Sequence, residues 1–278
     1  MFSLTKLRFD TPGVSIEYLM LYDISLIEEL LKSAGKIALK YCGNVTPSWK
    51  ENQTYVTEAD LAVQHYLKTE FERRFPDDGI IAEEQELAKD PSPSSDKRWI
   101  IDPIDGTASF VWGFPIWGIS LGLLEGVKPV GGFFYIPMTG EFFATMPDGT
   151  LSKNGRIAWM RTPDPSYREA VFLVDGRFNK WFSLDPAYEG KVRSLGSSVA
   201  QQCYVASGSA DIVLLLDIHI WDIAAGYAML QANHGIMEYF DGRPISFQDL
   251  LVNTKVPDAI LAGHPETVKH FRTLLSRR

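Results

Sequence analysis

The hydrophobic pattern near the start of the chain predicts an amphipathic helix. Between Asp23 and Tyr41, apolar residues recur every three or four positions, while charged residues occupy the opposite face. This period is typical of a helix that packs one side against a core. The predicted apolar stripe comprises Leu26, Ile27, Leu30, Leu31, Ala34, Ile37, Ala38 and Tyr41.

A second helix is predicted from about Thr57 to Phe75. Thr57 is followed three residues later by Asp60, and this spacing is typical of a capping pair at a helix start. An acid in the first helical turn also interacts favourably with the helix dipole. The side chains that we expect to face the core from this helix are Leu61, Leu67 and Phe71.

Between residues 79 and 149, short apolar runs separated by Gly, Pro and Asp predict a series of strands. The close succession of these runs favours a meander of antiparallel strands, and YIPMTGEFFA is typical of a hairpin. The runs are GIIAEE, RWIID, ISLGLLEG, PVGGFFYIP and EFFATMPDG.

Beyond about Pro163, strands and helices alternate, which predicts helices packed against a second sheet. No linker separates the two parts. We therefore expect one domain over residues 1–278, with an N-terminal half of about 1–162 and a C-terminal half of about 163–278. The predicted strands are EAVFLVDG, KVRSLG, DIVLLLD and IMEYFDG, and the predicted helices are SSVAQQCYVASG and WDIAAGYAMLQANHG. The tail HPETVKHFRTLLSRR predicts a final helix with an apolar side of Val268, Phe271, Leu274 and Leu275.

Charge and cysteine content narrow the class of protein. Acidic residues outnumber basic ones by 35 to 27 without a dense Lys/Arg run, so the electrostatic footprint of a nucleic-acid or phospholipid binder is missing. Cys42 and Cys203 fall in stretches expected to be helical, which favours buried free thiols and a reducing compartment. The N-terminal residues lack a signal-peptide pattern, and no apolar run approaches the ~20 residues of a membrane span. We expect a cytoplasmic protein without nucleic-acid or membrane partners.

The segment RWIIDPIDGTASF places two acids on one tight loop. An apolar strand ends at Asp102, and the chain turns at once through Pro103, Ile104, Asp105 and Gly106. Clusters of carboxylate oxygens suit Mg²⁺, which prefers oxygen ligands and retains several waters. An ordinary turn explains the same residues equally well, because Asp, Pro and Gly are the commonest turn residues.

Other acids could join this loop. Glu83 and Glu84 end the run GIIA as Asp102 ends RWII, so neighbouring strands could deliver acids to one edge, where like charges repel unless a cation joins them. Asp222 stands at the start of the WDIAAGYAML helix, where an acid commonly serves as a cap. Asp60 lies in the first turn of a helix, where the favourable interaction of an acid with the helix dipole is enough to explain it. Taken singly, each acid has a structural explanation.

In combination, these segments resemble the inositol monophosphatase-like family of lithium-sensitive, metal-dependent phosphatases. WIIDPIDGT, followed more than a hundred residues later by WDIAAG, is similar to the family's motif pair. The resemblance extends from roughly Asp23 to the final helix. It implies the family's α+β fold, a layered α-β-α-β-α sandwich of the inositol monophosphatase and fructose-1,6-bisphosphatase type.

The resemblance implies a ligand set for two or three Mg²⁺ ions. Two metal ions about 4 Å apart can activate a water and stabilise the leaving alkoxide. Direct attack by water, without a phosphoenzyme, is therefore expected. The residues that correspond to family ligands are Glu83, Asp102 and the carbonyl of Ile104 for the first metal, Asp102, Asp105 and Asp222 for the second, and Asp60 for the third.

Catalytic roles are implied in the same way. Thr107 corresponds to the hydroxyl that orients the attacking water, with Asp60 as its proton-accepting partner. Glu83 would reach the same water through the metal, and the amides of Gly106 and Thr107 would face the phosphate. Charge placement does most of the work in such phosphoryl transfers.

The substrate contacts depart from the pattern of inositol-specific members. Leu215 stands where those members usually carry Glu, and an apolar side chain cannot hydrogen-bond a sugar hydroxyl. Ser109 replaces the usual Asn. Gly196 and Ser197, with Arg193 upstream, resemble the family's substrate-facing strand and helix start, although a Ser-capped core helix explains them at least as well.

Lys50 resembles a basic residue that the family often keeps near the site, although a lone Lys in a polar loop is usually just solvated. The aromatic segment after the motif favours core packing, while one ring could form a wall of the substrate pocket. The rings concerned are Phe110, Trp112, Phe114 and Trp117. His219 is interpreted as structural, because the five histidines lack zinc-type spacing.

The sequence therefore predicts a Mg²⁺-dependent phosphoric monoester hydrolase acting on an inositol or sugar phosphate. Fructose 1,6-bisphosphate, 3′-phosphoadenosine 5′-phosphate and histidinol phosphate remain alternatives, as does a non-catalytic scaffold that retains the fold. The resemblance further implies lithium sensitivity and a homodimer.

Overall fold

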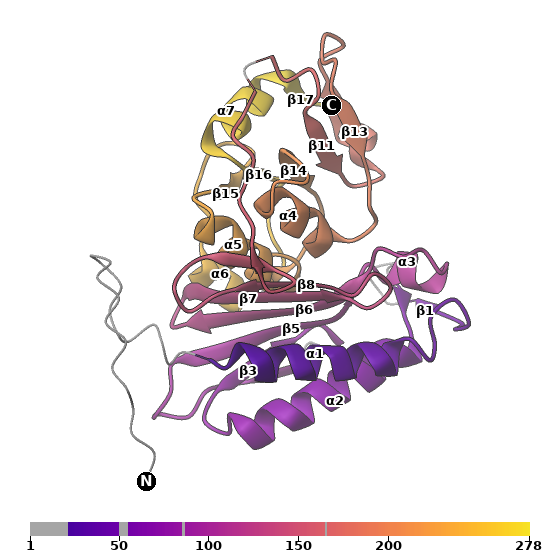
Figure 1. Cartoon of the computed structure of the whole chain (residues 1–278), viewed down its shortest axis with the longest axis vertical. Coiled ribbons are helices and arrows are strands. Elements are labelled where there is room, and N and C mark those ends of the chain that lie inside the picture. Colours follow the sequence, from indigo (N-terminus) through magenta and orange to yellow (C-terminus); the bar gives the residue numbers. More distant parts are fainter. Residues whose placement is uncertain (1–21, 50–54, 85–86, 165) are drawn as a thin grey trace.

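Five layers of secondary structure follow one another in the computed structural model, which describes residues 22–49, 55–84, 87–164 and 166–278. A helix pair covers one face of a large sheet, and central helices separate this sheet from a second sheet, which a C-terminal helix covers on its far side (Figure 1). The arrangement confirms the α-β-α-β-α sandwich expected from the sequence.

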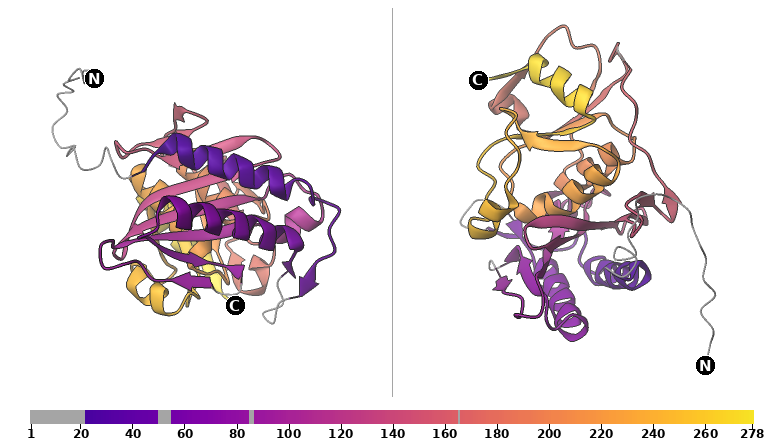
Figure 2. Two further views of the ribbon diagram at one scale, coloured as in Figure 1. Left: turned by 90° about the horizontal axis from the view of Figure 1, so that it is seen from below. Right: turned by 90° about the vertical axis from the view of Figure 1, so that its left-hand side faces the viewer.

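The outer layer consists of α1 (Ile24–Ala38) and α2 (Glu58–Arg74), which lie side by side under the large sheet (Figures 1 and 2). Asp23 begins α1 by accepting two backbone hydrogen bonds with its side chain. The helix ends before Tyr41, which lies in the following turn and is half-buried. Most of the predicted stripe is confirmed as core, namely Ile27, Leu30, Leu31, Ala34 and Ala38.

The start of α2 contains the predicted capping pair. The Thr57 hydroxyl accepts from the Asp60 amide at 3.4 Å, and the Asp60 carboxylate accepts from the Thr57 amide at 2.8 Å. Leu61 is 43% exposed, so the prediction that it faces the core is wrong. Asp60 occupies the buried face, and the next residue is turned ~100° away from it. The buried residues of the helix are Ala59, Asp60, Val63, Gln64, Leu67 and Phe71.

The large sheet has the strand order β10-β9-β8-β7-β6-β5-β3-β4. Pairing is antiparallel from β5 to β10, and the predicted hairpin is confirmed as β7 and β8. β3 instead pairs in parallel with β5, so the antiparallel prediction is wrong there; β4 and the following loop return the chain to the starting end of β3. The bounds are β3 (Gly79–Ala82), β4 (Leu87–Lys89), β5 (Lys97–Asp105), β6 (Gly118–Glu125), β7 (Lys128–Ile136), β8 (Glu141–Thr145), β9 (Leu151–Lys153) and β10 (Arg156–Ile157).

The second sheet has the order β13-β11-β14-β16-β15. The first three strands are parallel, and β16 is antiparallel to both of its neighbours. β16 was not predicted from the sequence. The bounds are β11 (Val171–Val174), β13 (Lys191–Arg193), β14 (Ile212–Leu215), β15 (Ile236–Tyr239) and β16 (Ile260–Gly263).

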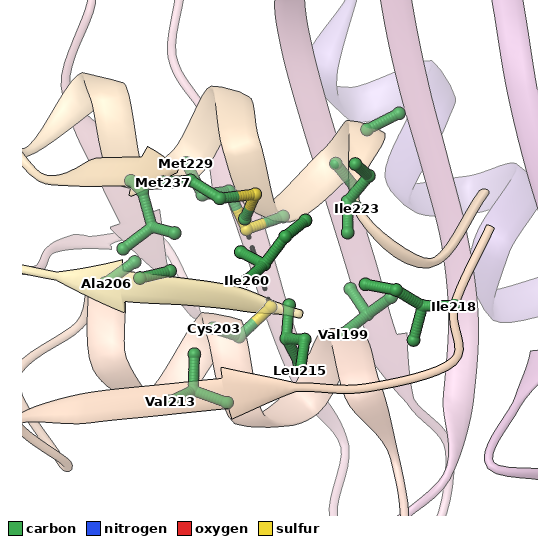
Figure 3. Close-up of a cluster of buried hydrophobic side chains, with 14 of the residues drawn as sticks. Val199, Cys203, Ala206, Val213, Leu215, Ile218, Ile223, Met229, Met237 and Ile260 are labelled. Atoms are coloured by element: carbon green, nitrogen blue, oxygen red, sulfur yellow. Dashed lines mark hydrogen bonds between the residues drawn. The ribbon is translucent and has the colours of Figure 1, made fainter. Parts of the chain in front are cut away.

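Helices α4 (Ser198–Ala206) and α5 (Ala224–Ala232) lie between the two sheets, with the short α6 (Phe247–Val252) at their side (Figure 1). One cluster of buried apolar side chains joins both halves of the chain. It includes Phe134 of the large sheet. It also includes Met229 of α5, Cys203 of α4 and Val213 of the second sheet (Figure 3). The central helices are therefore part of a core shared by both sheets.

The final helix, α7 (Pro265–Leu274), buries Val268 and Phe271 as predicted. Leu275 lies outside it and begins β17 (Leu275–Arg277), so its assignment to the helix is wrong. β17 pairs with β12 (Phe182–Leu184), so the chain after α7 continues as a strand and not as a helix. A second two-stranded pair is formed by β1 (Ser48–Trp49) and β2 (Tyr55–Val56).

Both cysteines are free thiols. Cys203 is buried in α4, whereas Cys42 lies half-buried in the turn after α1, outside the helix in which it was expected. Within the described part of the chain, no helix combines the length and the hydrophobicity that a membrane span requires.

Candidate metal centre

The ends of β3 and β5 bring acids to the same edge of the large sheet, because the two strands are parallel. The Glu83 amide donates to the Ile101 carbonyl at 3.2 Å, which keeps Glu83 beside β5 at the residue before Asp102. Gln64 of α2 fixes the next residue, since its side-chain amide donates to the Glu84 carbonyl and accepts from the Glu84 amide, both at 2.8 Å. A helix thus positions the loop that carries Glu83.

β5 continues to Asp105 with a shift of register after Asp102, so the prediction that the strand ends at Asp102 is wrong. Short-range bonds hold this end of the strand and the turn into α3 (Thr107–Val111). Asp102 Oδ1 accepts from the Ile104 amide at 3.0 Å, and the Thr107 hydroxyl donates to the Ile104 carbonyl at 3.1 Å. Gly106 adopts a φ of 91°, which favours glycine. A Cβ at Gly106 would lie 2.7 Å from the Gly196 carbonyl oxygen, so only glycine allows this close approach to the C-terminal half.

Asp105 is bound by the start of α4. Its carboxylate accepts from the Ser197 hydroxyl and from the amides of Ser198 and Val199, the latter two at 3.0 Å. Ser197 Oγ also accepts from the Ala200 amide at 3.1 Å, as a helix cap does. The C-terminal half therefore fixes an acid of the N-terminal half.

Asp222 comes from the short 3₁₀ helix η4 (Ile220–Asp222), immediately before α5. Its Oδ2 accepts from the His219 amide at 2.6 Å, and the His219 ring stacks on Trp221 with the centroids 4.8 Å apart. Asp222 is thus the last residue of a 3₁₀ turn, and Ile223 is the cap of α5.

These elements gather a carboxylate cluster of Asp102, Asp105 and Asp222, whose candidate ligand atoms all lie within 4.8 Å of one another. Asp102 and Asp105 are only 2% and 3% exposed. Burial raises the pKa of Asp102 well above its usual value, and the charges of Glu83, Asp105 and Asp222 raise it further. Burial also raises the pKa of Asp105 to about 6, although the Ser197 and α4 amide hydrogen bonds oppose the shift. An all-oxygen set of repelling carboxylates fits a hard divalent cation such as Mg²⁺.

A sequence model of the Inositol monophosphatase family matches residues 22–272. The chain belongs to this family. A histidinol-phosphatase from Chlorobaculum parvum is 32% identical over 231 residues, which cover 80% of this chain and 87% of that protein. A fructose-1,6-bisphosphatase/inositol-1-monophosphatase from Thermotoga maritima is 30% identical and covers 77% of this chain and 84% of its own length. The solved structure of a Thermotoga maritima IMPase superposes with a TM-score of 0.75 at 25% identity, covering 90% of this chain and 95% of that one.

The residues that family membership links to water and proton handling are held in separate hydrogen bonds. Asp60 is fully buried and accepts from the Thr57 hydroxyl at 2.5 Å. Thr107 donates to the Ile104 carbonyl. The pairing of Asp60 with Thr107 stays a prediction, and Lys50 lies outside the described residues.

The expected substrate contacts divide into buried and exposed residues. Ser197 is 2% exposed, and its hydroxyl is engaged by Asp105 and the Ala200 amide, so its substrate role stays a prediction. Arg193 is exposed and donates to the carbonyl of Val192. Gly196 adopts a φ of 80°, and its carbonyl accepts from the hydroxyl of Ser109 at 3.3 Å.

Leu215 lies in β14 and is 2% exposed. Its side chain points into the apolar cluster beside Cys203 and Ile260 (Figure 3). This placement agrees with the sequence-based view that the position offers no hydrogen bond to a sugar.

The aromatic segment after the motif is split between core and surface. Phe110 and Trp117 are fully buried and form an edge-to-face pair at 4.8 Å between centroids, as core packing predicts. Trp112 and Phe114 are 71% and 62% exposed, so the packing interpretation is wrong for these two rings.

Sequence reasoning missed two glutamines that hold the ligand-bearing segments, Gln64 and Gln202. Gln64 is 8% exposed and Gln202 is fully buried. Each is a long polar residue on an otherwise buried helix face, and this conflict with the hydrophobic pattern was the signal that could have identified them.

Proposed function

We propose that the chain is a Mg²⁺-dependent phosphatase that hydrolyses a small phosphate monoester at the carboxylate cluster. The observation that carries the proposal is the convergence of three mutually repelling carboxylates, from β5 and η4, in a member of the inositol monophosphatase family. Bound Mg²⁺ would neutralise these charges, polarise the phosphoryl group and lower the pKa of a water molecule.

The proposed ligand set follows the family motif on the positions described above. Asp102 would be shared between the two ions, and this role is supported by the electrostatic interaction of its carboxylate with Glu83, Asp105 and Asp222. The ligands would be Glu83, Asp102 and the Ile104 carbonyl for one ion, Asp102, Asp105 and Asp222 for a second, and Asp60 for a third.

The protein's own groups would orient the reaction. Thr107 Oγ1 would orient the attacking water, with Asp60 as the proton-accepting partner of this hydroxyl, and Glu83 would reach the same water through the metal. The amides of Gly106 and Thr107 would donate to the phosphate. A new P–O bond forms from the water oxygen, the ester P–O bond breaks on the opposite side, and the leaving alkoxide takes up a proton.

The substrate would be a sugar, polyol or amino-alcohol phosphate. The names of the two relatives, a histidinol-phosphatase and a fructose-1,6-bisphosphatase/inositol-1-monophosphatase, support this range. Leu215, buried in the core, speaks against an inositol-specific pocket. Gly196, Ser197 and Arg193 would border the substrate. 3′-Phosphoadenosine 5′-phosphate is an alternative substrate, and it is included in the panel of esters described below.

The proposal extends to the domain organisation, oligomeric state, inhibition and location of the protein. The two halves would act as one domain, because the apolar cluster and the Asp105 contacts join them. Family membership supports a homodimer, inhibition by Li⁺ and a cytoplasmic location, with small phosphorylated substrates as partners in place of nucleic acid or membrane.

Phosphate release from a panel of these esters tests the proposal. We expect turnover that requires Mg²⁺, falls with Li⁺ and drops by about 100-fold or more in Asp102→Asn and Asp222→Asn. Asp90→Asn is the matched control, because the Asp90 side chain is 94% exposed and lies on the surface. Activity that survives both chelation and the two substitutions would contradict the mechanism. Metal binding without release from any ester would favour the scaffold.

A further inference from the structure

Helix α4 contacts the metal centre at a second place besides Asp105. Gln202, one turn into the helix, is fully buried, and its Nε2 donates to the Ser198 carbonyl at 2.9 Å and to the Asp222 carbonyl at 2.7 Å. The opposite amide orientation would direct Oε1 at two carbonyl oxygens, which would repel it. The bonding pattern therefore fixes which end of the amide faces Asp222.

The Asp222 carbonyl lies where one helix type changes into another. η4 ends at Asp222, and α5 begins at Ala224 with the Tyr227 amide donating to the Ile223 carbonyl at 2.8 Å. Helical bonding to the Ile223 carbonyl thus starts one residue after Asp222, and Gln202 supplies a donor to the carbonyl before it. Gly226 leaves room for this side chain, because a Cβ there would collide with it.

The two contacts of α4 form one continuous chain of hydrogen bonds. The Val199 amide donates to Asp105, the Ser198 carbonyl of the same peptide unit accepts from Gln202, and Gln202 donates to Asp222. The carboxylate of Asp222 is held separately by the His219 amide. Both ends of Asp222 are therefore fixed, and one peptide unit of α4 connects the segments that carry Asp105 and Asp222.

We propose that Gln202 is a positioning residue for the metal centre, holding Asp222 at the separation from Asp105 that a divalent ion requires. This inference rests on the proposed function, because it takes these aspartates as metal ligands. Groups that orient ligands without touching the metal typically change affinity by about 10- to 100-fold when they are removed. Gln202 acts through the backbone of Asp222 and does not reach the metal or the substrate.

The test compares Gln202→Met with Gln201→Met. Gln201 is also buried in α4, at 4% exposure, but its side chain accepts from the Leu195 amide at 3.2 Å and has no bond to either aspartate. Mg²⁺ and Mn²⁺ binding would be measured by calorimetry, and Mn²⁺ binding also by electron paramagnetic resonance. We expect Gln202→Met to weaken metal binding by about tenfold and to raise the half-saturating Mg²⁺ for turnover equally. The KM of Gln202→Met for the phosphate ester, measured at saturating Mg²⁺, would stay near the wild-type value. The metal affinity of Gln201→Met would also stay near wild type.

Unchanged metal affinity in Gln202→Met, or equal weakening in both variants, would overturn the inference. If Gln202→Met does not fold, Gln202→Asn replaces it, since the shorter amide keeps its polarity but does not span the distance to Asp222. Wild-type affinity in Gln202→Asn would then overturn the proposal, and weakened affinity would support it. Wild-type protein that binds no Mg²⁺ would defeat the proposed function itself, a different result from wild-type binding with unaffected variants.

Discussion

Asp105 shows how one side chain can serve both the fold and the site. Its carboxylate accepts hydrogen bonds from the start of α4, yet it also faces Asp102 and Asp222 in a buried cluster. The hydrogen bonds favour the charged form and burial opposes it, with burial dominating, so that the pKa of Asp105 is raised to about 6. The pKa of Asp102 is raised more strongly by the same burial and by neighbouring charge.

These raised pKa values predict how stabilisation by Mg²⁺ depends on pH. Without metal, the folded protein binds protons on Asp102 and Asp105 more readily than the unfolded chain does. Their contribution to the free energy of unfolding therefore falls as pH rises above the ordinary carboxylate pKa of about 4, and the contribution of Asp105 falls through its pKa of about 6. Metal ligands must be deprotonated, so Mg²⁺ competes with these protons. We expect the Mg²⁺-induced increase in Tm to be larger at pH 7.5 than at pH 5.0.

Differential scanning calorimetry with matched Mg²⁺ and chelator samples measures this difference at each pH. Comparing the two samples at one pH removes the contribution of groups outside the metal centre. Asp105→Asn should shrink both the Mg²⁺ effect and its pH dependence. An equal increase in Tm at both pH values would show that these carboxylates do not control metal binding.

Single residues also show what the sequence could and could not predict. Asp102 and Asp105 were identifiable because an apolar run ends in a turn, and Asp222 because its motif follows in the family order. The bond from Ser197 to Asp105 spans 92 residues. A serine before a helix predicts a cap, but nothing local reveals that its hydroxyl also binds an acid of the other half.

At the level of elements, the long periodic segments were predicted well, and some of the short ones were missed. α1 and α2 have enough turns for their periodicity to be recognised, whereas β16 has four residues and α6 has six. The parallel pairing of β3 with β5 depends on where the intervening loop returns the chain, which the strand pattern does not contain. Even in α2, Leu61 was predicted to face the core, whereas the structure buries Asp60, the residue before it.

Two substitutions test the orientation of α2. Leu67→Ala should lower the free energy of unfolding by about 2–5 kcal/mol, because it removes a fully buried side chain and leaves a cavity. Leu61→Ala should change it by less than about 0.5 kcal/mol, since this leucine is 43% exposed. Urea denaturation monitored by circular dichroism provides both values. Comparable losses in the two variants would mean that Leu61 packs against the core in solution.

The start of α4 permits a second test at this scale. Ser197→Ala removes the cap of the helix and the hydroxyl bound to Asp105, and should lower the free energy of unfolding by about 1–2 kcal/mol. Ser197→Thr keeps a hydroxyl and should retain most of the stability. Chemical denaturation in the presence of chelator separates this effect from metal binding. If both variants were as stable as wild type, the cap would contribute nothing measurable.

Across the whole molecule, α4 is tied to the large sheet at both ends. Its start binds Asp105, and near its end the Tyr204 hydroxyl donates to Glu141 of β8 at 2.6 Å. Lys153 of β9 pairs with the same carboxylate at 2.5 Å and lies over the Tyr204 ring. Burial acts to raise the pKa of Glu141, but the contacts with Lys153, Tyr204 and Thr139 together outweigh it and lower this pKa. This polar contact joins the two halves away from the carboxylate cluster.

Tyr204→Phe tests whether that distant contact serves stability alone. The ring and its packing would remain, while Glu141 would lose one donor and keep Lys153 and Thr139. We expect the free energy of unfolding to fall by about 1 kcal/mol, because a hydrogen bond to a partly exposed charged group is lost. Metal affinity and kcat should be unchanged, since the start of α4 keeps its bonds to Asp105 and Asp222. Tyr204→Phe that instead weakened Mg²⁺ binding without lowering the free energy of unfolding would contradict this expectation. That result would mean that the Tyr204–Glu141 hydrogen bond helps to position α4 against Asp105 and Asp222, and does more than stabilise the fold.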